Sequence, residues 1–222
     1  ARAFADTVER RAFHYFWDLS DPQTGLTPDR WPTRSFASVG AMGFALTAYP
    51  IGAERGWVTR EAAAERTLAT LRFLWTARQD TAAAGATGYR GFYYHFLRPE
   101  DGTRFERVEL SSMDTALLMG GVLFCGEYFD GDAPAEREVH ALAESLYRRV
   151  DWAWLQVRPP VLSLGWSPEG GHLPYDWRGY NEAMLLHVLA LGSPTHPVGP
   201  EVWPAFTSRY RWGTFEGQAH VN

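Results

Sequence analysis

The sequence predicts an all-α domain that carries one small β-hairpin. Six stretches, and a short seventh near the end, show apolar residues at helical spacing together with helix start or stop signals. Two short apolar segments flank an Asp-Gly pair, which is typical of a hairpin. No strand–helix–strand alternation is present. These observations favour helices packed on helices.

The first two helices are marked by periodicity and by a cap. Residues 4–19 repeat apolar side chains at steps of three and four, and a loop rich in Pro, Asp and Thr follows over residues 20–34. Ser38 is suited to cap a second helix, because its hydroxyl can accept a free backbone N–H. We expect that helix to end near Tyr49, because Pro50 disrupts a helix interior.

A third helix and the hairpin come next. Thr59 is suited to cap the helix, and a Gly/Ala/Thr loop follows over residues 80–91. Residues 92–97 and 105–110 read as two short strands. Residues 101–102 (Asp-Gly) lie between them, so we expect the two strands to pair as a β-hairpin.

The fourth and fifth helices flank a turn. Ser111 or Ser112 caps a helix that runs to about Phe129, and residues 130–132 (Asp-Gly-Asp) form the turn. Pro134 then occupies a first helical position, where its missing N–H costs nothing. The fifth helix is expected to continue to about residue 150.

The last third of the chain contains a long loop before the sixth helix. Residues 156–180 are dense in Pro, Gly and Trp, and loops of this length inside a domain are usually functional or flexible. Asn181 is expected to cap the sixth helix, Gly192 to end it, and a short seventh helix to lie near residues 200–208.

The composition excludes several classes of function. All 21 basic residues are arginine, and the formal charge of the 222 residues is −5. We therefore expect no nucleic-acid partner and no membrane partner, and lysine-dependent P-loop or Schiff-base chemistry is excluded. No apolar run reaches the ~18 residues of a membrane helix. Cys125, the single cysteine, lies among apolar neighbours and is interpreted as a buried hydrophobic residue.

Metal and serine chemistry have no support in the sequence. The seven histidines form no His-x-x-x-His pair and no cluster with cysteine, so we expect no metal and no other cofactor. A G-x-S-x-G motif is absent as well. Aromatic residues make up 15% of the chain, and many lie among polar loop residues. Such rings suit the stacking of sugar rings, although they can equally cap the core at its wet edges.

Two loop-to-helix junctions carry acids. Residues 109–115 (ELSSMDT) contain Glu109 and Asp114, and residues 177–182 (WRGYNE) end with Glu182. Glycosidic bonds are cleaved by two carboxyl groups, of which one protonates the leaving oxygen and the other activates water or attacks the sugar. These acids are therefore candidates for a carboxyl pair.

Each acid also has an interpretation without catalysis. Asp114 and Glu182 lie in predicted first helical turns, where a carboxylate is stabilised by the helix macrodipole. Glu109 could be an exposed acid at the end of a strand. Apolar neighbours of Glu182 favour the protonated form that a proton donor needs, whereas the dipole opposes it. The residue pattern leaves both interpretations open.

Five motifs carry a family resemblance: residues 55–57 (RGW), 91–97 (GFYYHFL), 109–118 (ELSSMDTALL), 179–184 (GYNEAM) and 190–197 (ALGSPTHP). They resemble the bacterial glycoamylase-like domain family. That family is often described as putative glucoamylase and includes endo-β-1,2-glucanases. The transglycosylase domain of cyclic β-1,2-glucan synthases is similar.

The resemblance implies an (α/α)6 toroid with a groove for a β-glucan. A toroid of twelve helices with loops needs well over 222 residues. We therefore expect residues 1–222 to form a single glycoamylase-like domain that covers roughly the first half of the toroid and is incomplete at its C-terminus. The resemblance also implies a periplasmic or secreted monomer.

The resemblance implies site residues and an activity as well. The implied catalytic residues are Glu182, Asp114 and Glu109, and the implied sugar-contacting residues are Tyr93, His95, Trp166, Trp177 and Tyr180. The expected activity is hydrolysis of β-glucan, as in an endo-β-1,2-glucanase. Glucan transglycosylation, glycan binding without turnover, and α-glucan hydrolysis of the glucoamylase type are alternatives.

Overall fold

The computed structural model describes residues 2–33 and 35–221. Its helices are α1 (Arg2–Leu19), α2 (Val39–Glu54), α3 (Arg60–Thr76), α4 (Ser112–Tyr128), α5 (Pro134–Arg149), α6 (Met184–Gly192) and α7 (Val202–Thr207), with a 3-10 turn η1 (Trp152–Leu155). Its strands are β1 (Ala37–Ser38), β2 (Gly88–Tyr89), β3 (Phe92–Tyr93), β4 (Phe96–Leu97), β5 (Leu110–Ser111), β6 (Gly165–Ser167), β7 (Gly171–His172), β8 (Trp212–Phe215) and β9 (Gln218–Val221). The described part is thus mainly helical, as expected. None of its helices combines the length and the hydropathy needed to cross a bilayer.

Helix starts follow the caps that the sequence predicts. The side chains of Ser38, Thr59 and Ser111 accept backbone N–H groups at the starts of α2, α3 and α4. Pro134 occupies the first position of α5. These side chains satisfy N–H groups that have no partner within the helix, which is why the boundaries are readable from sequence.

Helix α2 does not end at Pro50, contrary to the prediction, but continues to Glu54. A proline at this position cannot donate to the carbonyl of Leu46, four residues earlier. The thiol of Cys125 in α4 donates to that carbonyl instead, with 3.0 Å between Sγ and the oxygen. Cys125 is fully buried, as predicted.

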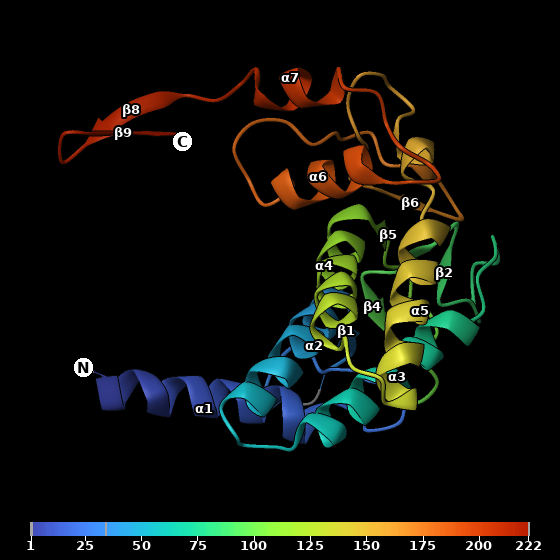
Figure 1. The fold of residues 1–222 in the computed structure, drawn as a ribbon. Coiled ribbons are helices and arrows are strands. Elements are labelled where there is room, and N and C mark those ends of the chain that lie inside the picture. Colours follow the sequence, from blue (N-terminus) through green and yellow to red (C-terminus); the bar gives the residue numbers. More distant parts are fainter. Residues whose placement is uncertain (1, 34, 222) are drawn as a thin grey trace.

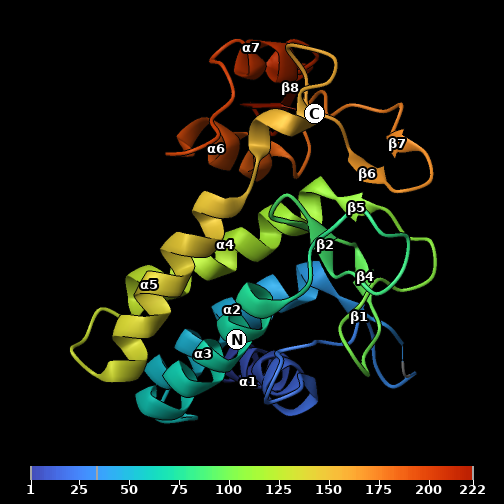
Figure 2. The same ribbon diagram turned by 90° about the vertical axis from the view of Figure 1, so that its right-hand side faces the viewer.

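The core lies among α2, α3, α4 and α5. Each of these helices packs against two others, in the order α2, α4, α5, α3 and back to α2 (Figures 1 and 2). Helices α2 and α4 approach closely at two glycines. A β-carbon on Gly121 would stand 2.3 Å from the carbonyl oxygen of Gly43, and one on Gly43 would stand 2.4 Å from the carbonyl oxygen of Leu117. Only glycine allows this separation.

The predicted hairpin is confirmed only in part. Antiparallel bridges join Tyr94 with Leu110 and Leu97 with Arg104, and the N–H groups of His95 and Phe105 donate to the carbonyls of Glu109 and Phe96. The continuous strands pair otherwise, however: β3 pairs with β2, β4 with β1, and β5 with β6. The backbone leaves the extended conformation at Glu106, where φ is +47°. Strands β3, β4 and β5 are two residues long, and both β4 and β5 pair with strands distant in sequence.

The long loop over residues 156–180 contains β6 and β7, which extend β5 into a three-stranded sheet. Helix α6 begins at Met184, two residues later than predicted. The side chain of Asn181 accepts the N–H of Ala183 in a local turn, so Glu182 lies in the turn before α6. The short helix predicted near residues 200–208 is confirmed as α7.

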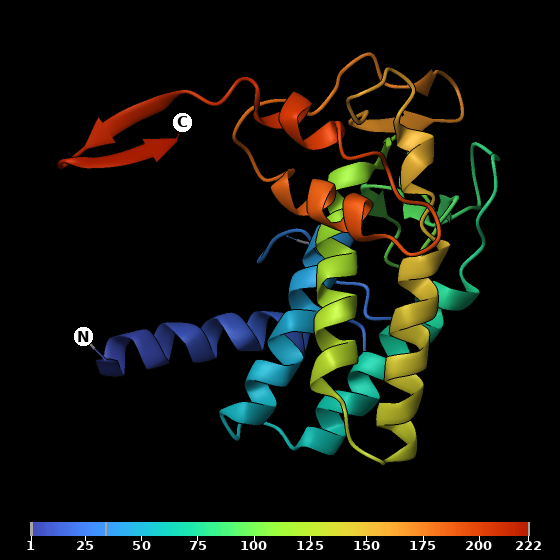
Figure 3. The same cartoon turned by 45° about the horizontal axis from the view of Figure 1, so that its top comes forward.

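The described chain has elements that extend away from this body. Helix α1 and the unpredicted hairpin β8–β9 project on the same side in two views (Figures 1 and 3). Apolar side chains of α2, α4 and α6 are also exposed to solvent. Phe44 of α2 is 53% exposed, Phe124 of α4 43% and Val188 of α6 54%.

Candidate active site

Glu109, His95 and Asp114 form a contiguous polar cluster where β4, β5 and the first turn of α4 meet. His95 Nδ1 lies 2.8 Å from Glu109 Oε1, and His95 Nε2 lies 3.4 Å from Asp114 Oδ2. The side chain of Asp114 is 15% exposed, and those of His95 and Glu109 are about one-third exposed. The structure therefore joins the two acids of the first predicted junction through one imidazole.

Backbone hydrogen bonds fix this cluster to two strands. The N–H of His95 donates to the carbonyl of Glu109 over 2.9 Å, and the carbonyl of His95 accepts the N–H of Val39 over 3.1 Å. Ser111 then begins α4 as its N-cap, so Asp114 follows in the first helical turn. The backbone of each residue in the cluster thus makes a hydrogen bond of its own, which fixes where its side chain starts.

Ser111 holds Asp114 through two hydrogen bonds. Its hydroxyl accepts the backbone N–H of Asp114 over 3.1 Å and donates to Asp114 Oδ2 over 2.5 Å. The other carboxylate oxygen, Oδ1, packs toward α2 at Gly40, where a β-carbon would stand only 2.6 Å away. Gly40 therefore makes room for the Asp114 carboxylate.

The electrostatics of the cluster favour the ionised pair. Burial lowers the pKa of His95, but the hydrogen bond to Glu109 and the negative charges of Asp114, Glu109 and Asp29 outweigh burial, so the pKa is raised above 6.5. Burial raises the pKa of Glu109, but the hydrogen bond from His95, aided by the charges of His95 and Arg104, lowers it overall. The two pKa shifts thus have the opposite directions expected of an imidazole and a carboxylate that attract each other.

Asp114 borders a hollow of about 340 Å³ between α1, α2 and α4, which we call the Asp114 hollow. It combines aromatic rings with two carboxylates. This mixture suits a ligand that has apolar faces and many hydroxyl groups. The hollow is lined by Tyr15, Phe16, Asp29, Ser38, Gly40, Ala41, Phe44, Asp114 and Leu117.

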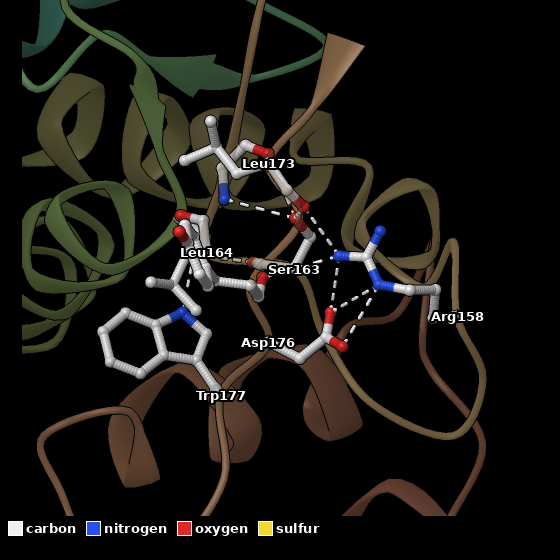
Figure 4. A network of polar contacts seen from close by, with 9 residues as sticks. Arg158, Ser163, Leu164, Leu173, Asp176 and Trp177 are labelled. Carbon is white, nitrogen blue, oxygen red and sulfur yellow. Dashed lines mark hydrogen bonds and ion pairs between the residues drawn. The ribbon is translucent and has the colours of Figure 1, made fainter. Parts of the chain in front are cut away.

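Trp177 is anchored beside this cluster by the long loop. Its indole N–H donates to the hydroxyl of Ser112, the first residue of α4, over 2.9 Å. Arg158 and Asp176 form an ion pair of 2.7 Å that stabilises the loop just before Trp177 (Figure 4). Trp177 thus bonds to the residue that follows the Ser111 cap, and its ring is partly buried.

Glu182 and Tyr180 lie in a different hollow, of about 620 Å³, which we call the Glu182 hollow. No contact joins Glu182 to Asp114 within the described chain. The two regions are linked through the packing of α6 on α4. Apart from Glu182, the lining is mostly apolar or aromatic: Tyr180, Asn181, Met184, Leu185 and Val188.

Two predicted sugar contacts lie elsewhere. Tyr93 is completely buried, and its hydroxyl donates to the Leu74 carbonyl and accepts from Arg149, so the structure assigns it to the core and corrects the expectation of a sugar contact. Trp166 is partly buried and packs against the rings of Tyr89 and Trp154, with centroids 5.4 and 5.8 Å away. Trp166 therefore packs mainly against other aromatic side chains, away from the Asp114–His95–Glu109 cluster.

Three further residues belong to the site and were not predicted for it from the sequence. Ser111 was predicted only as a helix cap, although the Ser-x-x-Asp spacing is a signal for its hydrogen bond to the Asp114 side chain. Asp29 lies in a loop and adds negative charge near His95, and Gly40 accommodates Asp114. Neither of these two has a local sequence signal, because both reach the site through tertiary packing.

Comparisons with known proteins agree with the motif resemblance. A family model described as "Putative glucoamylase" matches residues 174–222. The exo β-1,2-glucooligosaccharide sophorohydrolase (non-reducing end) of Parabacteroides distasonis is 28% identical, over 98% of this chain and 32% of its own length. The chain thus spans about a third of this curated relative.

Solved structures match over nearly the whole chain. A putative glucoamylase from Bacteroides fragilis has a TM-score of 0.85 and 30% identity, covering 100% of this chain and 55% of its own. The endo-β-1,2-glucanase of Chitinophaga pinensis, in complex with sophorotriose and glucose, has a TM-score of 0.84 and 25% identity, covering 97% and 54%. The chain is therefore similar to about half of each structure. The predicted resemblance to the glycoamylase-like family is confirmed, and the relatives with a named activity are glycosidases.

Proposed function

We propose that this protein is a glycoside hydrolase that cleaves β-1,2-linked glucan. We propose that it acts as an endo-glucanase, which cuts bonds in the interior of the glucan polymer. The observation that carries the proposal is the Asp114–His95–Glu109 cluster beside a sugar-sized hollow. It occurs in a chain similar to two enzymes whose names specify β-1,2-glucan substrates.

The chemistry follows from the carboxyl groups. Cleavage of a glycosidic bond needs one carboxylic acid to protonate the leaving oxygen and one carboxylate to activate water or attack the sugar. Asp114 and Glu182 are the proposed pair, and Glu109 supports Asp114 through His95. Trp177 and Tyr180 are proposed to contact the sugar, since both lie close to these acids along the same loop.

The groove itself is proposed to be larger than the described part. The relatives are about twice as long as this chain or more, which supports a complete (α/α)6 toroid in the whole protein. Residues 1–222 would then belong to a single domain of which they form one half. Glu182 and Asp114, in separate hollows here, would face one groove.

An exo-acting hydrolase is the second candidate, because the curated relative is named as an exo-enzyme that acts at the non-reducing end. The two modes give different products. An endo-glucanase shortens a long glucan into a range of oligosaccharides, whereas an exo-enzyme releases one short product from the start of the reaction.

The test is product analysis with the full-length protein. We expect β-1,2-glucan to yield short oligosaccharides, and β-1,3- and α-1,4-glucans to remain intact. Longer or cyclic products would identify a transglycosylase, cleavage of α-glucan a glucoamylase, and binding without products a binding module. No binding and no products with any glucan would contradict the proposal.

Variants test the carboxyl pair. Asp114→Asn and Glu182→Gln are each expected to lower kcat by about 10²-fold or more, because each removes an acid–base group. Glu61→Gln, on an exposed first turn of α3, is the matched control and should keep normal activity. Near-normal activity in both site variants would reject the assignment.

A further inference from the structure

We infer that Arg104 is a positioning residue for the proposed reaction, because its guanidinium holds the two chain segments from which His95 and Glu109 extend. None of its hydrogen bonds goes to either of these side chains. Arg104 therefore acts through the backbone and the neighbouring ring, and sets where the imidazole and the carboxylate meet beside Asp114. This inference rests on the proposed hydrolysis and deepens it by adding a residue behind the site.

Arg104 contacts the residue that precedes each member of the pair. Its Nε donates to the carbonyl of Val108 over 2.7 Å, and its guanidinium carbon lies 4.8 Å from the centre of the Tyr94 ring. The Val108 carbonyl belongs to the planar peptide group that also contains the N–H of Glu109, so holding the carbonyl fixes that plane. Tyr94 is followed directly by His95. One side chain thus holds both segments.

The Arg104 side chain is fully buried, and its partners restrict it to one orientation. Nη1 donates to the carbonyl of Ala83 over 3.2 Å and to Glu169 Oε1 over 2.7 Å, and Nη2 donates to Glu169 Oε2 over 3.0 Å. A guanidinium carries its five N–H donors in a fixed plane. Four directed hydrogen bonds and an aromatic ring facing that plane therefore leave it little freedom to turn.

Glu169 connects Arg104 to the strand that borders Glu109. It lies in the turn between β6 and β7, and β6 pairs with β5, which begins directly after Glu109. A β-carbon on Gly165 of β6 would lie 3.5 Å from Cγ of Glu109, so the Glu109 side chain packs against β6. The two strands that border this acid thus also supply the counterion of Arg104.

Arg60 provides a matched control with the same chemistry elsewhere in the fold. It donates to both carboxylate oxygens of Glu136 and to the carbonyl of Tyr128, and its guanidinium carbon lies 4.7 Å from the centre of the Tyr128 ring. Tyr128 is the last residue of α4, whereas Asp114 lies in its first turn. A helix of 17 residues is about 25 Å long, so Arg60 stabilises a region remote from the site.

NMR titration of the His95 imidazole in the full-length protein tests the inference without any substrate. Lysine keeps the charge of Arg104, but its compact ammonium group cannot bond a carbonyl and both oxygens of a carboxylate together. In Arg104→Lys we expect His95 to lose its close contact with Glu109, so its pKa should fall below the wild-type value. Arg60→Lys should leave the pKa of His95 unchanged. A wild-type value in folded Arg104→Lys, or an equal fall in both variants, would overturn the inference.

Kinetics on β-1,2-glucan give a second readout. Arg104→Lys should lower kcat by about 10-fold or more while KM stays within about threefold, because the bound glucan would meet a displaced cluster. Arg60→Lys should keep both constants, and wild-type kcat in folded Arg104→Lys would overturn the inference. If wild type itself cleaves no glucan, the proposed function is rejected, whereas the titration of His95 still decides the role of Arg104.

A milder variant covers the case in which Arg104→Lys does not fold, which circular dichroism would reveal. Glu169→Asp keeps the carboxylate charge but shortens the side chain by one methylene group, so the guanidinium must shift to stay paired. We expect the pKa of His95 and kcat to change in the same directions as in Arg104→Lys, by smaller amounts. Wild-type values of both in folded Glu169→Asp would equally overturn the inference.

Discussion

Cys125 donates its thiol proton to the carbonyl of Leu46, the acceptor that Pro50 leaves without a helical partner. Burial raises the pKa of this thiol to about 12, so it remains a protonated donor at ordinary pH. A single buried cysteine thus supports the continuation of α2 beyond a proline. This contact explains how a residue that normally ends helices is tolerated within one.

Cys125→Ala is expected to lower the free energy of unfolding by about 1–3 kcal/mol, because the Leu46 carbonyl loses its donor inside the core. Cys125→Ser keeps a donor and should cost less. In a Pro50→Ala background the backbone N–H returns, so the cost of Cys125→Ala should shrink by about 1 kcal/mol. Urea unfolding of the four variants measures this coupling, and strict additivity would show that the contact does not matter.

Neighbouring glycines of α4 should respond oppositely to alanine. Gly121→Ala would drive a β-carbon to 2.3 Å from the Gly43 carbonyl, so we expect destabilisation of about 1–3 kcal/mol or more. At Gly120 the nearest atom is a flexible Leu185 methyl at 3.4 Å. Gly120→Ala should therefore be neutral or stabilising by up to about 1 kcal/mol. Equal effects in thermal unfolding would contradict the close packing of α2 and α4.

The ion pair between buried Arg104 and exposed Glu169 should contribute much of the order of the neighbouring loops. The Arg104 side chain is fully buried, with 2.7 Å between its nitrogen and Glu169 Oε1. Glu169→Ala should cost about 3 kcal/mol, because it leaves that charge with carbonyl partners alone. Glu100→Ala, at an exposed position, should stay within about 0.5 kcal/mol of wild type. Chemical denaturation would compare the two, and equal stabilities would refute the role of the pair.

The stability contributed by the ion pair between Arg104 and Glu169 should depend on pH in the acid range. The hydrogen bond from Arg104 lowers the pKa of Glu169 from 4.5 to about 2. A lowered carboxyl pKa contributes stability that is present above pH 4.5 and is lost as pH falls toward 2. The stability difference between wild type and Glu169→Ala should therefore shrink over that range, whereas a pH-independent difference would speak against the ion pair.

The contact between His95 and Glu109 should be strongest in a limited pH window. The raised pKa of His95 stabilises the fold fully below pH 6.5, and this contribution is lost as pH rises through the folded value. The lowered pKa of Glu109 stabilises it fully above pH 4.5, and this contribution is lost as pH falls through the folded value. The stability advantage of wild type over His95→Gln should thus peak between these two values. NMR titration of the imidazole provides the direct check, and an apparent pKa below 6.5 would contradict the contact.

The helices were largely predictable because their ends depend on nearby side chains. Ser38, Thr59 and Ser111 each cap the helix expected of them. The failures arose where distant residues decide. The continuation of α2 through Pro50 depends on Cys125 from another helix. The hairpin β8–β9 turns at Glu216 and Gly217, both with positive φ, and Glu-Gly is not a typical hairpin signal.

The candidate site was predictable only in part. The sequence placed Glu109 and Asp114 at one junction, and the structure joins them through His95. It could not reveal that Gly40 accommodates Asp114, because that contact joins two helices separated by many residues. Tyr93 lay in the right motif but faces the core, since two-residue strands give no reliable alternation between inner and outer faces.

Self-association is favoured by the exposed apolar side chains of α2, α4 and α6. Helices without a polar side are ordinarily enclosed by other structure, and water in contact with Phe44, Phe124 and Val188 favours association of these surfaces. We therefore expect a polypeptide of residues 1–222 to self-associate as its concentration rises, which light scattering over a concentration series would detect.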